Sequence, residues 1–262
     1  MPTEQKKREI KDLIDHLKKH KDAVLIIGEK IASELNIKSV SDEDGEKTFN
    51  RKSWVKNPTD FWTYYFENIY KNINDIQEIP KLYQSINELL SLGLIKKVFS
   101  MNTHGVLKEA INLKGTGTGI KCSKCGEEYD LKTITGNLVE AIPKLTCKKC
   151  NTPKKMRPTC LMYGEHYLFS QMKEMLAEIF NEQEGEEVVP NTHTVIYLGV
   201  DMEEDFMGEL IDNYVLVRDR IEDECFNVMI TDSAGTVELF KPEFATVDDM
   251  ESSLDRLIDL LK

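Results

Sequence analysis

The sequence predicts an α/β protein, a Rossmann-like doubly wound parallel sheet with a small zinc-ribbon module inserted into it. Short apolar runs alternate with stretches of helical periodicity, the order of elements typical of a parallel sheet covered by helices on both faces. The run "AVLIIG" from Ala23 to Gly28 ends in glycine and leads into a helical pattern, as nucleotide-binding α/β units begin. Two Cys-x2-Cys pairs follow the second predicted strand and indicate the inserted module.

The same patterns place the individual elements. Strands are expected at residues 23–28, 94–102, 157–165, 194–199 and 225–231, and helices at residues 10–17, 29–37, 57–73, 82–90 and 168–179 and at the C-terminus. In the helix at 57–73, Asn57 is the expected N-cap and Pro58 the first helical residue. The C-terminal helix is expected to start after Thr246 as its N-cap. The polar segment 38–50 predicts an exposed loop.

Charge and hydropathy narrow the classes of function. With 34 Lys and Arg against 46 Asp and Glu in 262 residues, the net charge of −12 argues against attraction of the whole surface to nucleic acid or to anionic lipid. No apolar run approaches the roughly 20 residues that cross a bilayer, and the first residues lack the hydrophobic core of a signal peptide. We therefore expect a cytoplasmic protein that has no membrane partner and does not bind nucleic acid, and a protein or peptide is the partner left open. The pattern does not indicate an oligomeric state.

The cysteine spacing is typical of a structural zinc site. Cys122 and Cys125, then Cys147 and Cys150, form two Cys-x2-Cys pairs. Each pair can wrap a turn so that its two thiolates face one cation, and four thiolates complete a tetrahedral shell with no position left for water. The alternative, four unrelated reduced thiols, does not account for the doubled spacing. Two further cysteines lie in apolar runs and are expected in the core: Cys160 and Cys225.

The cysteine segment is a basic island on an acidic protein. Its basic residues are Lys121, Lys124, Lys132, Lys144, Lys148, Lys149, Lys154, Lys155 and Arg157, and they outnumber Glu127, Glu128, Asp130 and Glu140. We interpret it as a solvated surface whose charge the zinc-bound thiolates partly neutralise. A docking face for an acidic partner is the alternative.

The cysteine pairs, together with "MRPTCLMYGE" at residues 156–165, resemble the sirtuins, the family of NAD-dependent protein deacylases. The segment "VLIIGEKIASELNI" stands where that family has "GAGIS", "FSMNTHGVLKEA" where it has "TQNIDGLHERAG", and "NLKGTGTGIKCSKC" where it has "ELHG" and the first zinc pair. The segment "YLGVDM" falls on the "GTSL" strand end. The resemblance covers most of the chain.

The resemblance implies where a cofactor and catalytic groups belong. Gly28, Asn102 and Gly199 match positions that bind NAD, and Asn102 and His104 fall in the family's catalytic motif. Lys114 occupies the place of the histidine that acts as general base on the cofactor ribose. A lysine of ordinary pKa is almost wholly protonated at pH 7, so Lys114 is a poor base. Asn102, His104 and Lys114 are the catalytic candidates. A lone histidine such as His104 at a strand end is more often structural.

Other departures affect the cofactor loop. Glu29 and Lys30 replace the small residues that let a backbone approach a pyrophosphate, and Asp201 replaces a hydroxyl residue at the next strand end. The acidic residues Glu203–Asp205 follow Asp201. These changes make NAD a doubtful cofactor, although acidic residues in the first turn of a helix also favour the helix dipole.

The sequence leaves three hypotheses of function open. The first is a divergent sirtuin-like protein that keeps zinc and scaffold, has weak or lost NAD-dependent deacylation and acts as a binding or regulatory protein. The second is an active NAD-dependent deacylase or ADP-ribosyltransferase with altered catalytic residues. The third is docking through the basic cysteine segment. The expected domains are a Rossmann-like domain of residues 1–114 and 158–262, a zinc module of residues 115–157, and a helical or cofactor-loop insertion at 38–80.

Overall fold

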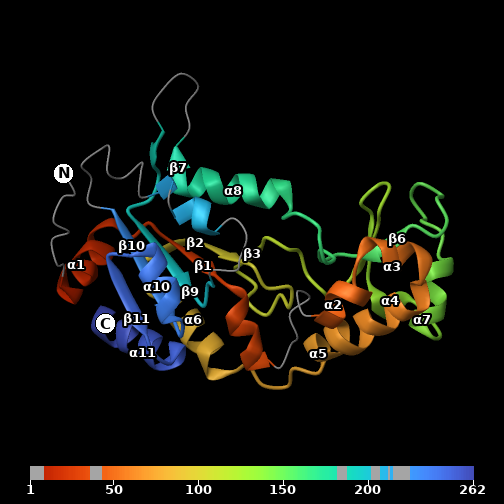
Figure 1. The fold of residues 1–262 in the computed structure, drawn as a ribbon, viewed down its shortest axis with the longest axis horizontal. Helices are drawn as coiled ribbons and strands as arrows, with labels where there is room; N and C mark the ends of the chain where they lie inside the picture. The colour runs from red at the N-terminus through yellow and green to blue at the C-terminus, as the bar shows by residue number, and fades with distance from the viewer. Residues whose placement is uncertain (1–8, 36–42, 182–187, 202–206, 212, 215–224) are drawn as a thin grey trace.

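The structure, a computed structural model, describes residues 9–35, 43–181, 188–201, 207–211, 213–214 and 225–262. Its larger lobe contains a six-stranded sheet in the order β11-β10-β9-β1-β2-β3, and all neighbouring strands are parallel (Figure 1). The strands are β1 (Ala23–Ile27), β2 (Ile95–Ser100), β3 (Ile111–Asn112), β9 (Thr194–Leu198), β10 (Phe226–Thr231) and β11 (Phe244–Val247). The predicted doubly wound parallel sheet is confirmed.

Helices cover both faces of this sheet because every central strand is apolar on both sides. Leu25 and Ile27 of β1 pack in a core with α1 (Ile10–His20), α6 (Lys81–Ser91) and α11 (Met250–Leu261). Val24 and Ile26, which point to the other face, pack in a second core with α8 (Phe169–Ile179) and with Phe240 of α10 (Ala234–Phe240). The alternation follows from the two-residue period of a strand.

The smaller lobe holds the cysteines and a set of short helices (Figure 1). Its antiparallel sheet β5-β4-β6 is made of β4 (Ile120–Cys122), β5 (Glu128–Tyr129) and β6 (Met156–Pro158). Its helices and turns are α2 (Glu43–Thr48), α3 (Arg51–Lys56), α4 (Pro58–Tyr64), the π-helical turn η2 (Tyr65–Tyr70), α5 (Lys71–Asn74), η3 (Leu131–Thr133), α7 (Leu138–Ala141) and η4 (Ile142–Lys144). As predicted, α4 begins at Pro58 with Asn57 as N-cap.

One hydrophobic core joins the helices of residues 43–74 to the cysteine segment. Phe49, Phe61 and Trp62 are fully buried in the same cluster as Cys122 and Cys147. The Trp54 indole N–H donates to the Met156 carbonyl at 2.8 Å and connects α3 to β6. The two segments, 43–74 and 115–157, therefore form one packed unit although about 40 residues of the larger lobe separate them in sequence.

Several elements differ from the sequence prediction. Residues 157–165 do not form a strand of the large sheet: β6 pairs antiparallel with β4, and Arg157 Nη1 then donates to Glu165 Oε1 at 2.7 Å across a turn that contains Gly164 with φ of +77°. The strand that pairs in parallel with β2 at this edge of the large sheet is instead the short β3. Within the expected loop at 38–50, residues 43–48 form α2 and Phe49 is buried.

Two more differences lie at element ends. Thr246 belongs to the unpredicted edge strand β11, and the last helix is capped by Asp249, whose side chain accepts from Ser252 N–H at 2.8 Å. The helix expected at 29–37 is a 3-10 helix, η1 (Glu29–Leu35), in its described part. The acidic cluster Glu203–Asp205 lies outside the described residues. Among the described helices, none has the length and apolarity needed to span a bilayer.

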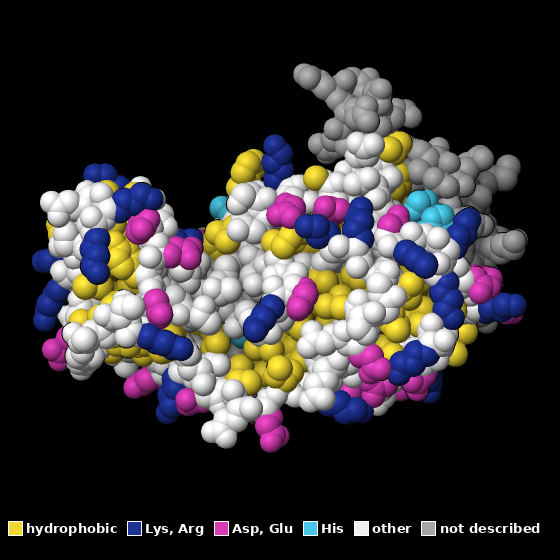
Figure 2. Space-filling model, turned by 180° about the vertical axis from the view of Figure 1, so that it is seen from behind, with side chains coloured by type: hydrophobic (Ala, Val, Ile, Leu, Met, Phe, Trp, Pro, Cys, Tyr) yellow, Lys and Arg dark blue, Asp and Glu magenta, His cyan; other side chains and the backbone are white. Residues whose placement is uncertain are grey.

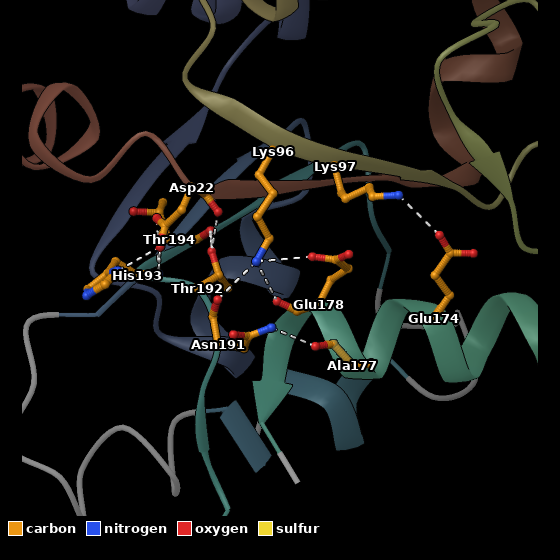
Figure 3. Close-up of polar contacts among 10 residues, drawn as sticks. All are labelled: Asp22, Lys96, Lys97, Glu174, Ala177, Glu178, Asn191, Thr192, His193 and Thr194. Carbon is orange, nitrogen blue, oxygen red and sulfur yellow. Dashed lines mark hydrogen bonds and ion pairs between the residues drawn. The ribbon is translucent and has the colours of Figure 1, made fainter. Parts of the chain in front are cut away.

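Polar contacts hold α8 against the amino ends of the strands (Figure 3). Lys96 Nζ contacts Glu178 Oε2 at 3.1 Å and the Asn191 carbonyl at 3.0 Å, and Lys97 Nζ contacts Glu174 Oε1 at 3.2 Å. After α8 the chain forms β7 (Phe180–Asn181), which pairs with β8 (Val189–Pro190). These contacts give the amino ends of the strands a structural role. Ligands of open α/β sheets bind at the carboxyl ends of the strands, so the candidate site is expected there.

Candidate functional site: a four-cysteine cluster and a polar pocket

The four predicted zinc ligands come together in the smaller lobe. The sulfur atoms of Cys122, Cys125, Cys147 and Cys150 all lie within 4.8 Å of one another. Cys122 Sγ is 3.7 Å from Cys150 Sγ, and Cys125 Sγ is 3.6 Å from Cys147 Sγ. A tetrahedron of 2.3 Å Zn–S bonds has edges of about 3.8 Å. The cluster therefore has the size that a zinc ion requires, and the site fits the metal.

Two hydroxyl groups contact sulfurs of the four-cysteine cluster, and the sequence prediction missed both. The Tyr129 hydroxyl lies 3.2 Å from Cys147 Sγ as a donor and accepts the Lys148 backbone N–H at 2.7 Å. Thr152 Oγ1 lies 3.2 Å from Cys150 Sγ. Such partners orient thiolates and moderate their charge. If the four cysteines hold zinc as thiolates, their sulfurs would accept hydrogen bonds from these hydroxyls.

Replacing Tyr129 with phenylalanine is expected to weaken zinc retention while leaving the fold intact. The change removes the O–H···S hydrogen bond to Cys147 but keeps the aromatic ring, and loss of an outer-shell partner typically costs about 10–100-fold in metal affinity. Zinc transfer to a chromogenic chelator measures the effect. Tyr163→Phe is the control, because the Tyr163 hydroxyl faces Glu46 rather than a cysteine. Equal transfer rates for Tyr129→Phe and the wild type would contradict the assignment.

A polar pocket of about 400 Å³ lies at the carboxyl ends of the parallel strands. Residues that directly follow β1, β2 and β10 line it, together with Lys114 and the start of α11. The lining includes Glu29, Lys30, Ala32, Ser33, Glu34, Met101, Asn102, Thr103, His104, Lys114, Asp232, Asp249 and Met250. The three catalytic candidates of the sequence analysis therefore share one pocket.

Lys114 is ion-paired inside the pocket. Its Nζ contacts the Glu29 carboxylate, and the two side chains are only 16% and 22% exposed. The same Nζ lies 5.3 Å from the centre of the Tyr167 ring, within the range of a cation–π contact. Both neighbours favour the ammonium form of Lys114. An ammonium group donates hydrogen bonds and cannot accept a proton.

Lys30 connects the ends of three strands across the pocket. Its Nζ lies 2.7 Å from Asp232 Oδ1 and 3.1 Å from Asp201 Oδ2, which follow β10 and β9. The pKa of Lys30 is raised because these hydrogen bonds and charges together outweigh its partial desolvation. The sequence analysis did not name Asp232. Its position directly after a predicted parallel strand could have identified it, because ligands of open α/β sheets bind at the carboxyl ends of the strands.

Gly28 and Gly199 pack against each other. A Cβ atom on Gly28 would lie 2.1 Å from the Gly199 carbonyl oxygen, and one on Gly199, whose φ is +63°, would lie 2.7 Å from Ile31 Cγ2. The Gly28 amide donates to the Leu198 carbonyl at 2.9 Å and the Lys30 amide donates to the Gly199 carbonyl at 3.3 Å. The packing of the loops after β1 and β9 thus accounts for both glycines.

Asn102 is buried at the base of the pocket with one acceptor unused. The side chain is 3% exposed, and its Nδ2 donates to the Gly28 carbonyl at 2.7 Å. Oδ1 is buried and has no hydrogen-bond partner in the protein. The opposite amide orientation would place two acceptor oxygens 2.7 Å apart, so the contact fixes Oδ1 as the unsatisfied atom.

His104 is held by a chain of hydrogen bonds. The Val106 N–H donates to Nδ1 at 3.1 Å, so the neutral ring carries its proton on Nε2 and donates to the Tyr83 hydroxyl at 2.9 Å. Tyr83 donates in turn to the Ile31 carbonyl at 3.1 Å. Burial lowers the pKa of His104 to about 4, which keeps the ring neutral at pH 7. Both ring nitrogens are occupied within the protein, which favours a structural role for His104.

The model of the Sir2 family matches residues 33–189 of this chain. The NAD-dependent protein deacylase 2 of Archaeoglobus fulgidus is 27% identical over 170 residues, which are 60% of this chain and 65% of that protein. The match thus spans less than two thirds of the relative's length.

Solved structures agree with the sequence match. The crystal structure of a Sir2 homolog–NAD complex superposes with a TM-score of 0.73 at 16% identity, covering 96% of this chain and 93% of that one. A Sir2–p53 peptide–NAD⁺ structure superposes with a TM-score of 0.71 at 17% identity, covering 96% and 98%. At these identities the structures establish the shared fold. The fold, the clustered cysteines and a family match over more than half of the residues show that the chain belongs to the Sir2 family, the sirtuins.

Proposed function

We propose that this chain is a divergent sirtuin that keeps the scaffold and a structural zinc site but has weak or lost NAD-dependent deacylation. It acts in the cytoplasm as a binding or regulatory protein, and its partner is a protein or peptide. The zinc supplies a structural crosslink through four thiolates and leaves no position for catalysis. The chain keeps the architecture of the family, whereas the side chains that line its pocket are altered.

The ion pair between Lys114 and Glu29 carries this proposal. Lys114 stands where sirtuins have the histidine that removes a proton from the cofactor ribose, and here that position holds an ammonium beside a carboxylate. General-base catalysis requires a group that is unprotonated at the working pH. His104 does not substitute for it, because its two nitrogens are bonded to Val106 and Tyr83.

The residues at the strand ends also fit poorly to the pyrophosphate of NAD. The Lys30 amide is bonded to Gly199, and the Lys30 ammonium is shared by Asp201 and Asp232. Glu29 adds a carboxylate at the first loop position. Two anionic groups brought to about 4 Å repel by roughly 4 kcal/mol at the effective dielectric of a protein surface. A dinucleotide would have to break Lys30 away from its partners to gain a cation.

Titration calorimetry with NAD and ADP-ribose is the test. We expect no binding tighter than about millimolar at pH 7.5, because the amide and ammonium donors at the strand ends are bonded within the protein. Zinc-loaded protein with a sharp thermal transition provides the folding control. Micromolar binding of either nucleotide would overturn the proposal and favour an enzyme.

The second candidate is an active NAD-dependent deacylase or ADP-ribosyltransferase with altered residues. The unsatisfied Oδ1 of buried Asn102 favours it, because a ribose hydroxyl could donate to that oxygen. In this alternative Lys114 must first leave Glu29 and lose its proton. Turnover should then rise with pH, whereas the binding-protein hypothesis predicts that turnover is weak or absent at every pH.

Docking through the basic cysteine segment remains a weaker alternative. Lys149 Nζ pairs with Glu127 Oε2 at 2.9 Å, so part of the charge is neutralised within the segment. On the face drawn in Figure 2, acidic side chains are interspersed with basic ones over the smaller lobe. This distribution favours a solvated surface.

A further inference from the structure

We propose that three histidines at the amino ends of the strands bind a divalent transition-metal ion, separately from the four-cysteine cluster. The histidines are His16, His20 and His193, and the metal is one that imidazole prefers, such as zinc, nickel, copper or cobalt. Such an ion would tie helix α1 to the start of strand β9. The inference does not depend on the proposed function, because the polar pocket lies at the opposite ends of the strands.

The three imidazole rings form one cluster. The ring centres of His16 and His20 are 4.4 Å apart, those of His20 and His193 are 3.7 Å apart, and those of His16 and His193 are 6.0 Å apart. Helix α1 places the first two on one face because they are four residues apart. Histidines at this spacing on a helix hold zinc in the metalloprotease motif His-Glu-x-x-His.

The separations match the size of a three-imidazole metal site. A metal–nitrogen bond of about 2.0–2.1 Å puts each ring centre about 3.2 Å from the ion, so ring centres at the tetrahedral angle are about 5.2 Å apart. The observed separations lie on both sides of this value. Among the described residues, only the four cysteines have their ligand atoms gathered within 4.8 Å, and His20 and His193 are stacked at 29°. A ring must therefore turn about χ2, a broad torsion in histidine, to direct a nitrogen at a shared ion.

Asp22 orients the ring of His193 (Figure 3). Its Oδ2 lies 2.7 Å from Nδ1 of His193, and a carboxylate only accepts, so Nδ1 carries the proton. In the neutral ring Nε2 then holds the lone pair with which imidazole binds a metal. A carboxylate behind a histidine is the usual outer-shell partner of a metal-bound imidazole. The pair is therefore an observation, independent of the ring spacing, that points to a metal.

The ring of His16 also has a defined lone pair, and the cluster is open to solvent. His16 Nε2 lies 3.3 Å from the His193 carbonyl oxygen, which only accepts, so in the neutral ring Nδ1 carries the lone pair. His16 is 5% exposed, whereas the side chain of His193 is 36% exposed. Figure 2 shows histidine side chains together at the surface of the larger lobe. An ion can therefore approach from the side of His193.

Titration of the zinc-loaded protein with cobalt(II) at pH 7.5 tests the inference. Zinc occupies the four cysteines at the start, and metal analysis before the titration measures it. We expect one further equivalent of cobalt per chain, bound in about the micromolar range. Its visible spectrum should show d–d absorption without the charge-transfer bands of a cobalt thiolate. Cobalt should also raise the thermal unfolding midpoint, because an ion that binds only the folded chain stabilises it.

Variants locate the bound cobalt. His20→Ala and His193→Ala should each weaken binding at least about tenfold, because losing a ligand costs at least as much as losing an outer-shell partner. Asp22→Asn keeps the size of the side chain without its charge, and we expect it to weaken binding by about 10–100-fold. His166→Ala is the matched control, since this exposed histidine lies between β6 and α8, and it should bind cobalt like the wild type. Thermal unfolding without cobalt checks the fold of each variant.

Three results would overturn the site. The first is the absence of a further equivalent of cobalt in the zinc-loaded wild type. The second is a spectrum with thiolate charge-transfer bands, which would place the cobalt at the cysteines. The third is binding, with the same rise in unfolding midpoint, in folded His20→Ala and His193→Ala, which would place the ion elsewhere on the acidic surface.

Discussion

Replacing Cys147 with serine is expected to abolish stoichiometric zinc binding and to unfold the smaller lobe. Cys147 is one of four sulfurs that lie within 4.8 Å of one another, and serine at this position cannot supply the thiolate that closes the shell. Zinc contributes about 10–16 kcal/mol in isolated zinc-finger peptides, so the loss of one ligand exceeds the usual effect of a point substitution. Metal analysis and thermal unfolding measure the result, and we expect the midpoint to fall by at least about 10 °C.

The effect should extend beyond the cysteine segment. Cys147 belongs to the same core as Phe61 and Trp62, so loss of zinc should also expose Trp62 and change its fluorescence. Cys225→Ala is the control for a buried thiol outside the cluster, because it removes a sulfur that lies 3.9 Å from the Thr192 carbonyl oxygen and brings no new polar group into the core. Full zinc content and unchanged unfolding in Cys147→Ser would show that the four cysteines do not hold a structural metal.

Replacing Lys114 with histidine is expected to leave NAD-dependent turnover undetectable. The change restores the family's base and removes the ion pair with Glu29, and a positioned base typically supplies about 10²–10⁴-fold in rate. It does not release Lys30 from Asp201 and Asp232 or open the packing between Gly28 and Gly199. Nicotinamide release measures the outcome. A rise of about 10²-fold would show that only the base is missing and that the cofactor site is intact.

Local patterns in the sequence were sufficient to predict the central strands and the four-cysteine cluster. The runs at 23–28, 194–199 and 225–231 are apolar because both sheet faces are covered, and the paired Cys-x2-Cys spacing determines how four sulfurs approach each other. The short edge strands could not be predicted from such patterns. β3 has two residues, and β11 lies at a sheet edge where only alternate side chains are partly buried.

The missed parts of the site depend on contacts between distant segments. Tyr83 reaches His104, and Lys30 reaches Asp232 across 202 residues of sequence. The segment 157–165 has the composition of a strand, yet the pair Arg157–Glu165 closes it into a turn. Hydrophobic periodicity along the sequence does not predict such pairings, because they depend on where the tertiary fold places two polar side chains.

Deacetylation of an acetyl-lysine peptide by the wild-type, zinc-loaded protein in the presence of NAD tests the central claim most directly. Mass spectrometry of the peptide and measurement of released nicotinamide give two independent readouts. We predict that neither product exceeds the background without protein, because the proposed function puts an ion-paired lysine, Lys114, where the reaction needs a base. Robust NAD-dependent deacetylation that is lost in Asn102→Ala and unaffected in Lys114→Ala would contradict the account and identify a working sirtuin with a different base.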